Sequence, residues 1–328
     1  MVRIAFVGDV MLGRLVAAQL RQGRRPESCW GDLTSPLHSA DAVIANLECA
    51  ITSHDEPWRR TPKVFHFGAD PVAAEVLKAG NIRAVSLANN HILDFDVQGL
   101  ADTLQHLDRA GIAHAGAGLS EADAFAPARF KAGGLNVALF AVTDNEPPFS
   151  AHGANPGTAF VDPSNTESAP RPGAAEIERA RKAGAELVVL SCHFGPNMVL
   201  EPSAAIRSYR RAAISRGVDI VHGHSAHVVQ SIERLGNALI LHDTGDFLDD
   251  YAVDPAMRND LSFVFLIETE RAQLRRLLLV PVALDCGQVH RARHDDAAYL
   301  CTRTMALSAK FGTALSRTDE GLELVLRG

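Results

Sequence analysis

Residues 83–111 read RAVSLANNHILDFDVQGLADTLQHLDRAG and contain a complete strand, loop and helix pattern. The apolar, β-branched run 83–88 is typical of a buried strand. Asn-Asn-His at 89–91 follows it directly, and apolar residues then recur at helical spacing over 97–110. Gly111 suits the end of that helix. The segment therefore predicts a buried strand whose carboxyl end carries a polar triplet, followed by a helix.

The same alternation of strand and helix patterns extends over most of the chain and predicts an α/β fold with a largely parallel core. Pro, Gly, Ser and Asn dominate 147–172, which predicts a long loop excursion. No shift in composition marks a boundary, so we expect residues 1–328 to form a single domain. Later segments favour a mixed sheet or a second sheet packed on the first. The strands expected there are 228–232, 238–241, 261–269 and 274–284.

The composition excludes several classes of protein. The chain has 328 residues, 47% hydrophobic and 22% charged, with a formal net charge of -7, which is ordinary for a globular protein and argues against nonspecific nucleic-acid binding. It contains no apolar run that could span a membrane, and its first residues lack the pattern of a signal peptide. Five cysteines without a CxxC pair favour a reducing compartment, so we expect a cytoplasmic protein. The oligomeric state is left open.

Residues of types that commonly bind metals follow one predicted strand after another. They are Asp9, Glu48, Asn90, His91, His193, and the histidines of HGHSAH at 222–227, with His242 further on. Because the carboxyl ends of strands line the ligand crevice in open α/β sheets, we expect these side chains to converge at one edge. Imidazoles with carboxylate and amide oxygens suit a divalent ion, and they do not distinguish Mn, Zn, Fe, Ca and Mg.

Several segments resemble, in order, the motifs of the CapA family of bacterial capsule and poly-γ-glutamate synthesis proteins. They are GDVMLGR, NLECAIT, SLANNHILDFDVQGL, GAGLSEADAF, SCHFG, VDIVHGHSAHVVQ and TGDFLDD. That family in turn is similar to the calcineurin-like metallophosphoesterases. The resemblance implies an α/β fold of two packed mixed β-sheets flanked by helices, a four-layer sandwich with a metal centre at the strand ends.

The resemblance also implies roles for individual residues. Metal ligands would be Asp9, Asn90, His193, His224 and His227, with one or two divalent ions bound. Phosphoesterases carry a His where this chain has Met11, and their bridging Asp has no counterpart; Asn46 and Glu48 occupy that region. A mononuclear or asymmetric site is therefore as compatible with the sequence as a full dinuclear site.

Three further residues are candidates for the chemistry beside the metal. His91 is the candidate general acid or oxyanion stabiliser, and Asp94 could orient it or cap the following helix. Glu48 could be a ligand, a general base or a loop residue in a salt bridge. Arg14 could bind an anionic group of the substrate, although a solvated arginine is the more common outcome for such a residue. Cys192 is expected to be a core residue, because the period of a strand turns it away from His193.

Three functions remain open at this point. The first is a metal-dependent hydrolase that acts on a phosphoester or on a peptide or poly-γ-glutamate-type amide. The second is a metal-assisted proton transfer at a peptide Cα, as in an epimerase. The third is a non-enzymatic binding subunit of a polymer-synthesis system. The partner is accordingly a small molecule, a peptide or an acidic polymer.

Overall fold

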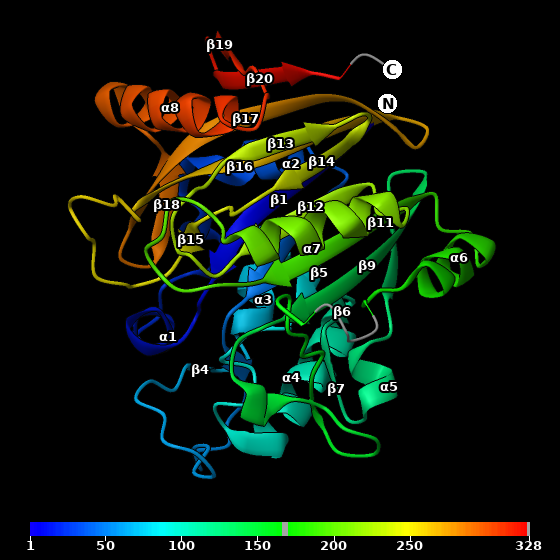
Figure 1. The fold of residues 1–328 in the computed structure, drawn as a ribbon. Helices are drawn as coiled ribbons and strands as arrows, with labels where there is room; N and C mark the ends of the chain where they lie inside the picture. Colours follow the sequence, from blue (N-terminus) through cyan, green and yellow to red (C-terminus); the bar gives the residue numbers. More distant parts are fainter. Residues whose placement is uncertain (166–169, 327–328) are drawn as a thin grey trace.

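The computed structural model describes residues 1–165 and 170–326. It contains two large mixed sheets that pack face to face, with helices on their outer faces (Figure 1). The predicted fold class, two packed mixed sheets flanked by helices, is confirmed. The part of the predicted excursion at 166–169 lies outside the described residues. Within the described ranges, no helix has the length and apolar character required to cross a membrane.

The larger sheet has ten strands, and its centre is parallel as expected. Its order is β19-β20-β17-β16-β1-β2-β5-β6, with β15 beside β1 and β18 beside β17. The strands are β1 (Val2–Val10), β2 (Ala42–Leu47), β5 (Ile82–Ser86), β6 (Ala113–Ala115), β15 (Asp246–Leu248), β16 (Leu261–Glu270), β17 (Gln273–Asp285), β18 (Gln288–Arg291), β19 (Ser316–Thr318) and β20 (Gly321–Val325).

The second sheet has six strands in the order β13-β14-β12-β11-β9-β8. Its members are β8 (Ala128–Ala132), β9 (Leu135–Thr143), β11 (Leu187–His193), β12 (Ile220–His224), β13 (Ile232–Leu235) and β14 (Ala238–Leu241). Two short ladders pair β3 (Ala50–Ile51) with β4 (Gly68–Ala69) and β7 (Ala117–Gly118) with β10 (Gly157–Thr158).

Helices cover the outer face of each sheet. One apolar cluster lies beneath the helices on each side, and another lies between the two sheets. The α-helices are α1 (Arg14–Arg21), α2 (Thr34–His38), α3 (Ala73–Ala79), α4 (Asp96–Ala110), α5 (Glu121–Ala124), α6 (Ala174–Lys182), α7 (Ala204–Ser215) and α8 (His294–Ala309), and the 3₁₀ helices are η1 (Pro26–Leu33) and η2 (Pro147–Phe149). In the 147–172 excursion, the described residues form only η2 and β10 as regular elements.

The strand predicted over 228–232 is wrong except at Ile232, which begins β13. Val228 and Val229 are buried, as the apolar pattern suggests, but they belong to an irregular segment between β12 and β13. Its backbone is held by an isolated bridge from Val229 to Thr244 and by the Gln230 amide, which donates to the Asp243 carbonyl. An apolar run can thus be buried without forming a strand when a loop crosses the end of the sheet.

Candidate metal centre

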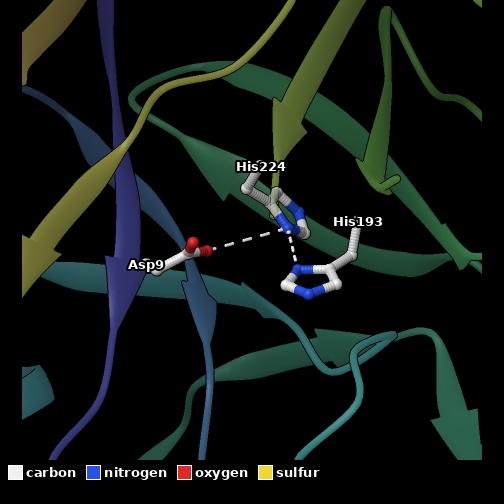
Figure 2. A group of neighbouring side chains, drawn as sticks. All are labelled: Asp9, His193 and His224. Carbon is white, nitrogen blue, oxygen red and sulfur yellow. Dashed lines mark hydrogen bonds and ion pairs between the residues drawn. The ribbon is translucent and has the colours of Figure 1, made fainter. Parts of the chain in front are cut away.

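The candidate site lies where strand ends from both sheets meet. Asp9 comes from β1 of the larger sheet, whereas His193 and His224 end the neighbouring strands β11 and β12 of the smaller sheet (Figure 2). The parallel register pairs His193 with His224, so both imidazoles reach the same edge. One donor atom from each of the three residues falls within 4.8 Å of the others.

A close approach of two backbones brings Asp9 and Asp246 into the same place. Asp9 pairs with Asp246 across β1 and β15, and its amide donates to the Gly245 carbonyl. A Cβ built at Gly8 would lie 1.7 Å from that carbonyl oxygen, so only glycine allows the two segments to come this close. Gly8 therefore sets the position of the first carboxylate.

A second donor group shares Asp9 with the first. It consists of Asp9, Glu48 and His227, all buried, again with their donor atoms within 4.8 Å. His227 Nδ1 lies 2.7 Å from Asp246 Oδ1 and 3.5 Å from Asp9 Oδ2. His227 is thus oriented by one carboxylate while it faces another.

Hydrogen bonds fix the orientation of the donors. Asn46 Nδ2 donates to Asp9 Oδ1 over 2.8 Å, and Ser191 Oγ lies 2.7 Å from His224 Nε2. His193 Nδ1 lies 2.8 Å from His224 Nδ1, and His193 Nε2 lies 2.9 Å from Asn90 Oδ1. The structure therefore brings all five predicted ligands into one cluster, in which Asn90 is half-buried and the other four are buried.

The cluster fits a divalent cation because two of its buried carboxylate oxygens have no hydrogen-bond partner in the part of the chain that the structure describes. Among the described residues, Asp9 Oδ2 and Glu48 Oε1 are buried oxygens without a hydrogen-bond partner. Burial raises the pKa values of Asp9, Glu48 and Asp246 well above their usual range, and neighbouring carboxylates add to the effect. Groups of this kind are stabilised by a cation placed between them, and carboxylate with imidazole is a donor set that divalent metals accept.

The histidines of the cluster differ in charge. Burial lowers the pKa values of His193 and His224 well below their usual range, so both rings are neutral near pH 7 and retain a free lone pair. Burial would lower the pKa of His227 as well, but Glu48 and Asp9 raise it above its usual value. The lone pairs of His193 and His224 are therefore available to an ion, and an ion bound to Asp9 and Glu48 would oppose the effect of these carboxylates on His227.

His91 and Asp94 form a buried pair next to the cluster. His91 Nδ1 lies 2.6 Å from Asp94 Oδ2, and that oxygen also accepts a hydrogen bond from the Phe67 amide. Of the two roles predicted for Asp94, the contact with His91 is observed. Asp94 does not cap α4, because the amino-terminal end of that helix has no capping hydrogen bond from any described side chain. Burial raises the pKa of Asp94 to about 7 and lowers that of His91 well below its usual range.

Arg14 and Glu48 take different surroundings. Glu48 is fully buried, with Oε2 accepting a hydrogen bond from the Tyr251 hydroxyl and Oε1 3.8 Å from His193 Nε2, so it is no surface salt-bridge residue. Arg14 lies at the rim of a cavity of about 570 Å³ that opens over His91, His227 and Asn90. Its Nε is 3.5 Å from Asp250, and its side chain is 41% exposed.

Two of the strand-end histidines lie away from the donor groups. His242 Nε2 lies 3.0 Å from Glu233 and its ring packs on Phe311, so the expectation that it joins the cluster is wrong. His222 turns between the sheets, where Nε2 lies 2.9 Å from the Val7 carbonyl oxygen. Cys192 is buried in the apolar cluster beneath α6 and α7, as predicted.

Three residues of the site carried no signal in the sequence analysis. Lys63 donates to the Asn90 carbonyl over 2.7 Å and lies 3.4 Å from Asp94 Oδ1. Phe67 stacks on His91 with ring centroids 3.9 Å apart, and Tyr251 holds Glu48. All three lie in irregular segments, where neither periodicity nor motif spacing fixes a position.

Comparison with known proteins gives a consistent picture. The family model described as bacterial capsule synthesis protein PGA_cap matches residues 3–251. A probable polyglutamine synthesis accessory protein of Mycobacterium tuberculosis is 31% identical over 310 residues, which covers 90% of this chain and 80% of that protein. The PGA biosynthesis protein CapA of Bacillus subtilis is 30% identical over 248 residues, 75% of this chain and 63% of that protein.

Two further matches extend the comparison. The capsule biosynthesis protein CapA of Bacillus anthracis is 26% identical over 330 residues, 98% of this chain and 77% of that protein. Among solved structures, the NAD nucleotidase of Haemophilus influenzae matches with a TM-score of 0.44 at 11% identity, over 92% of this chain and 62% of that one.

Proposed function

The chain belongs to the PGA_cap family of bacterial capsule synthesis proteins, and from the geometry of its site we propose that it is a metal-dependent phosphoester hydrolase. One observation carries the proposal: Asp9 belongs to both donor groups, so the two groups lie side by side with a common carboxylate. Adjacent cation positions of this kind suit in-line displacement at phosphorus.

The residues that would hold the ion or ions are Asp9, Glu48, His193, His224 and His227, with Asn90 Oδ1 beside His193. A divalent ion bound there would supply a Lewis acid for the phosphoryl oxygen and lower the pKa of water. Mn, Zn, Fe, Ca and Mg all remain compatible with this donor set.

The protein's own contribution to proton transfer comes from His91 and Asp94. The short contact between Nδ1 and Oδ2 engages one side of the ring, which leaves Nε2 for the cavity. When the pair carries two protons, one is available at Nε2 for the oxygen of the leaving group. Asp94 keeps the ring oriented, and Lys63 and the Phe67 amide hold Asp94 in turn.

A second candidate is hydrolysis of an amide in an acidic polymer, and the names of the relatives favour it. The relatives are named for polyglutamine or PGA synthesis. The same Lewis acid and the same His91–Asp94 pair would serve a carbonyl centre. Proton transfer at a peptide Cα would use Glu48 as the base, because its buried Oε1 has no partner among the described residues.

The test measures hydrolysis of 4-nitrophenyl phosphate with Mn²⁺ alongside elemental analysis of the protein. We expect His193→Ala to abolish hydrolysis and to lower the bound Mn²⁺, and His114→Ala, which changes a histidine paired with Asp108 away from the site, to leave both unchanged. If deuterium from the solvent enters a peptide Cα without bond cleavage, the proposed hydrolase is wrong and the function is proton transfer. Absence of a bound ion at millimolar Mn²⁺ would refute both and leave a binding subunit.

A further inference from the structure

Aromatic rings lead from His91 to the surface of the protein. Phe67 stacks on His91 at 3.9 Å and 23°, and Phe65 lies 6.4 Å from Phe67 at 29°. Phe67 is 4% exposed, whereas Phe65 is 60% exposed. The row therefore starts at the proposed proton donor and ends with a ring that presents much of its surface to solvent.

The same rings form a wall of the cavity above the metal centre. Phe65, Phe67 and Tyr251 line it together with Val64, which is 85% exposed. Large exposed apolar side chains side by side at the mouth of a polar site mark a surface that binds something apolar. The Arg14 guanidinium lies 5.7 Å from the Phe67 ring and provides positive charge at the rim.

The backbone that carries Phe65 is tied to the site. Lys63, two residues earlier, is bonded to the Asn90 carbonyl and lies 3.4 Å from both Asp94 and Glu146. Phe67, two residues later, is fixed through its amide to Asp94. The backbone on both sides of Phe65 is therefore fixed relative to His91.

We propose that the site selects substrates whose leaving group carries a flat apolar ring, and that Phe65 is the residue that recognises this ring. The inference rests on the proposed phosphoester hydrolysis and names the class of its substrate. The leaving group must lie beside His91, because that residue delivers its proton, and from there the aromatic wall continues outward.

Apart from Arg14, whose Nε lies 3.5 Å from Asp250, the charges around the cavity support an apolar group over an anionic one. Glu146 lines the same cavity and would repel a negatively charged leaving group. The Lys63 ammonium is occupied by Asn90, Asp94 and Glu146, and its side chain is 6% exposed. An anion placed against Phe65 and Val64 would lose hydration without gaining a partner there.

The test uses two phosphonates that the protein cannot hydrolyse and that differ in their organic group. Phenylphosphonate and methylphosphonate are titrated by calorimetry into the full chain in the presence of Mn²⁺. We expect Phe65→Ala to weaken phenylphosphonate about five-fold, the value of one ring–ring contact, and to leave methylphosphonate unchanged. Phe65→Tyr keeps the ring and should keep the affinity. Leu119→Ala removes another exposed apolar side chain, 48% exposed and outside the cavity, and should change neither affinity.

The outcomes separate this inference from the function on which it rests. If Phe65→Ala weakens both phosphonates equally, or neither, recognition of a ring by Phe65 is wrong while metal-dependent phosphoryl binding stands. If neither phosphonate binds to the Mn²⁺-supplemented wild-type protein, the proposed phosphoester site itself fails, and the inference fails with it.

Discussion

Replacing Glu48 by Gln should stabilise the ion-free protein and weaken ion binding at the same time. Glu48 is fully buried, and its Oε1 is one of the site oxygens that lack a hydrogen-bond partner in the described part of the chain. Burial and the neighbouring Asp9 raise its pKa well above the usual value. Without an ion, the charged carboxylate therefore opposes folding, and a neutral amide of the same shape removes that cost.

The expected size follows from the environment of Glu48. An unsatisfied buried polar group costs about 1–3 kcal/mol. A chain of 328 residues unfolds with an entropy of about 0.7 kcal/mol/K, so Glu48→Gln should raise the melting temperature in EDTA by about 1.5–4 °C. Because the folded-state pKa of Glu48 is raised, the wild type loses stability as the pH rises through that pKa, and the gain from Glu48→Gln should increase with pH above the ordinary range of a glutamate.

Addition of Mn²⁺ should remove most or all of the advantage that Glu48→Gln has in EDTA. An ion at 100 times its dissociation constant stabilises the wild type by about 2.7 kcal/mol, or about 4 °C on the same entropy scale. If the variant binds 100-fold more weakly, the same Mn²⁺ concentration shifts it by less than about 1 °C. Scanning calorimetry with EDTA or Mn²⁺ measures both effects in one experiment.

Glu233→Gln provides the matched control. Glu233 is also buried, but it is paired, with Oε2 3.0 Å from His242 and Oε1 2.8 Å from Arg211 Nε. Its replacement should lower the melting temperature with and without Mn²⁺ and leave the Mn²⁺ shift intact. A Glu48→Gln protein that melts below the wild type in EDTA and keeps the full Mn²⁺ shift would refute the assignment of Glu48 to the ion site.

Three other predictions concern separate parts of the structure. Asp94→Asn should reduce kcat by about 10²–10⁴ with unchanged metal content, since proton donation by His91 depends on it. In the wild type, kcat should fall as the pH rises through about 7, where the pair loses its second proton, and this inflection should vanish in the variant. Cys192, whose burial raises its pKa to about 12, should resist an aromatic disulfide reagent at pH 8, whereas the exposed Cys286 reacts; rapid labelling of Cys192 in tryptic maps would contradict the packing. Gly8→Ala should abolish the folded protein, as seen by circular dichroism, because its Cβ would overlap the Gly245 carbonyl.

The ends of regular strands are the part of the site that the sequence can predict. Asp9, His193 and His224 each close an apolar run, and parallel pairing necessarily brings such ends to one edge. The two-sheet architecture follows from the CapA resemblance together with the strand-rich second half. Met11 is also accounted for, because its thioether is buried in the core and accepts a hydrogen bond from the Gly13 amide.

The residues of the site that the sequence could not predict lie in loops or depend on the direction of a side chain. Lys63 and Tyr251 reach the site from segments without period or motif, so only tertiary packing places them there. His242 directly follows strand β14, whereas His193 is the last residue of β11, and the His242 ring turns toward Glu233. Within a strand, successive side chains point to opposite faces of the sheet, so sequence position fixes their direction. A residue in the loop after the strand is not bound by this rule.

The distribution of the donors along the chain has a consequence for biosynthesis. Asp9 leaves the ribosome before the strands that supply His193 and His224, whereas His227 emerges only after them. No amino-terminal fragment that ends before residue 227 contains both donor groups, so complete loading follows docking of the second sheet on the first. Chains that extend past residue 227 are therefore the first that can offer both donor groups to an ion.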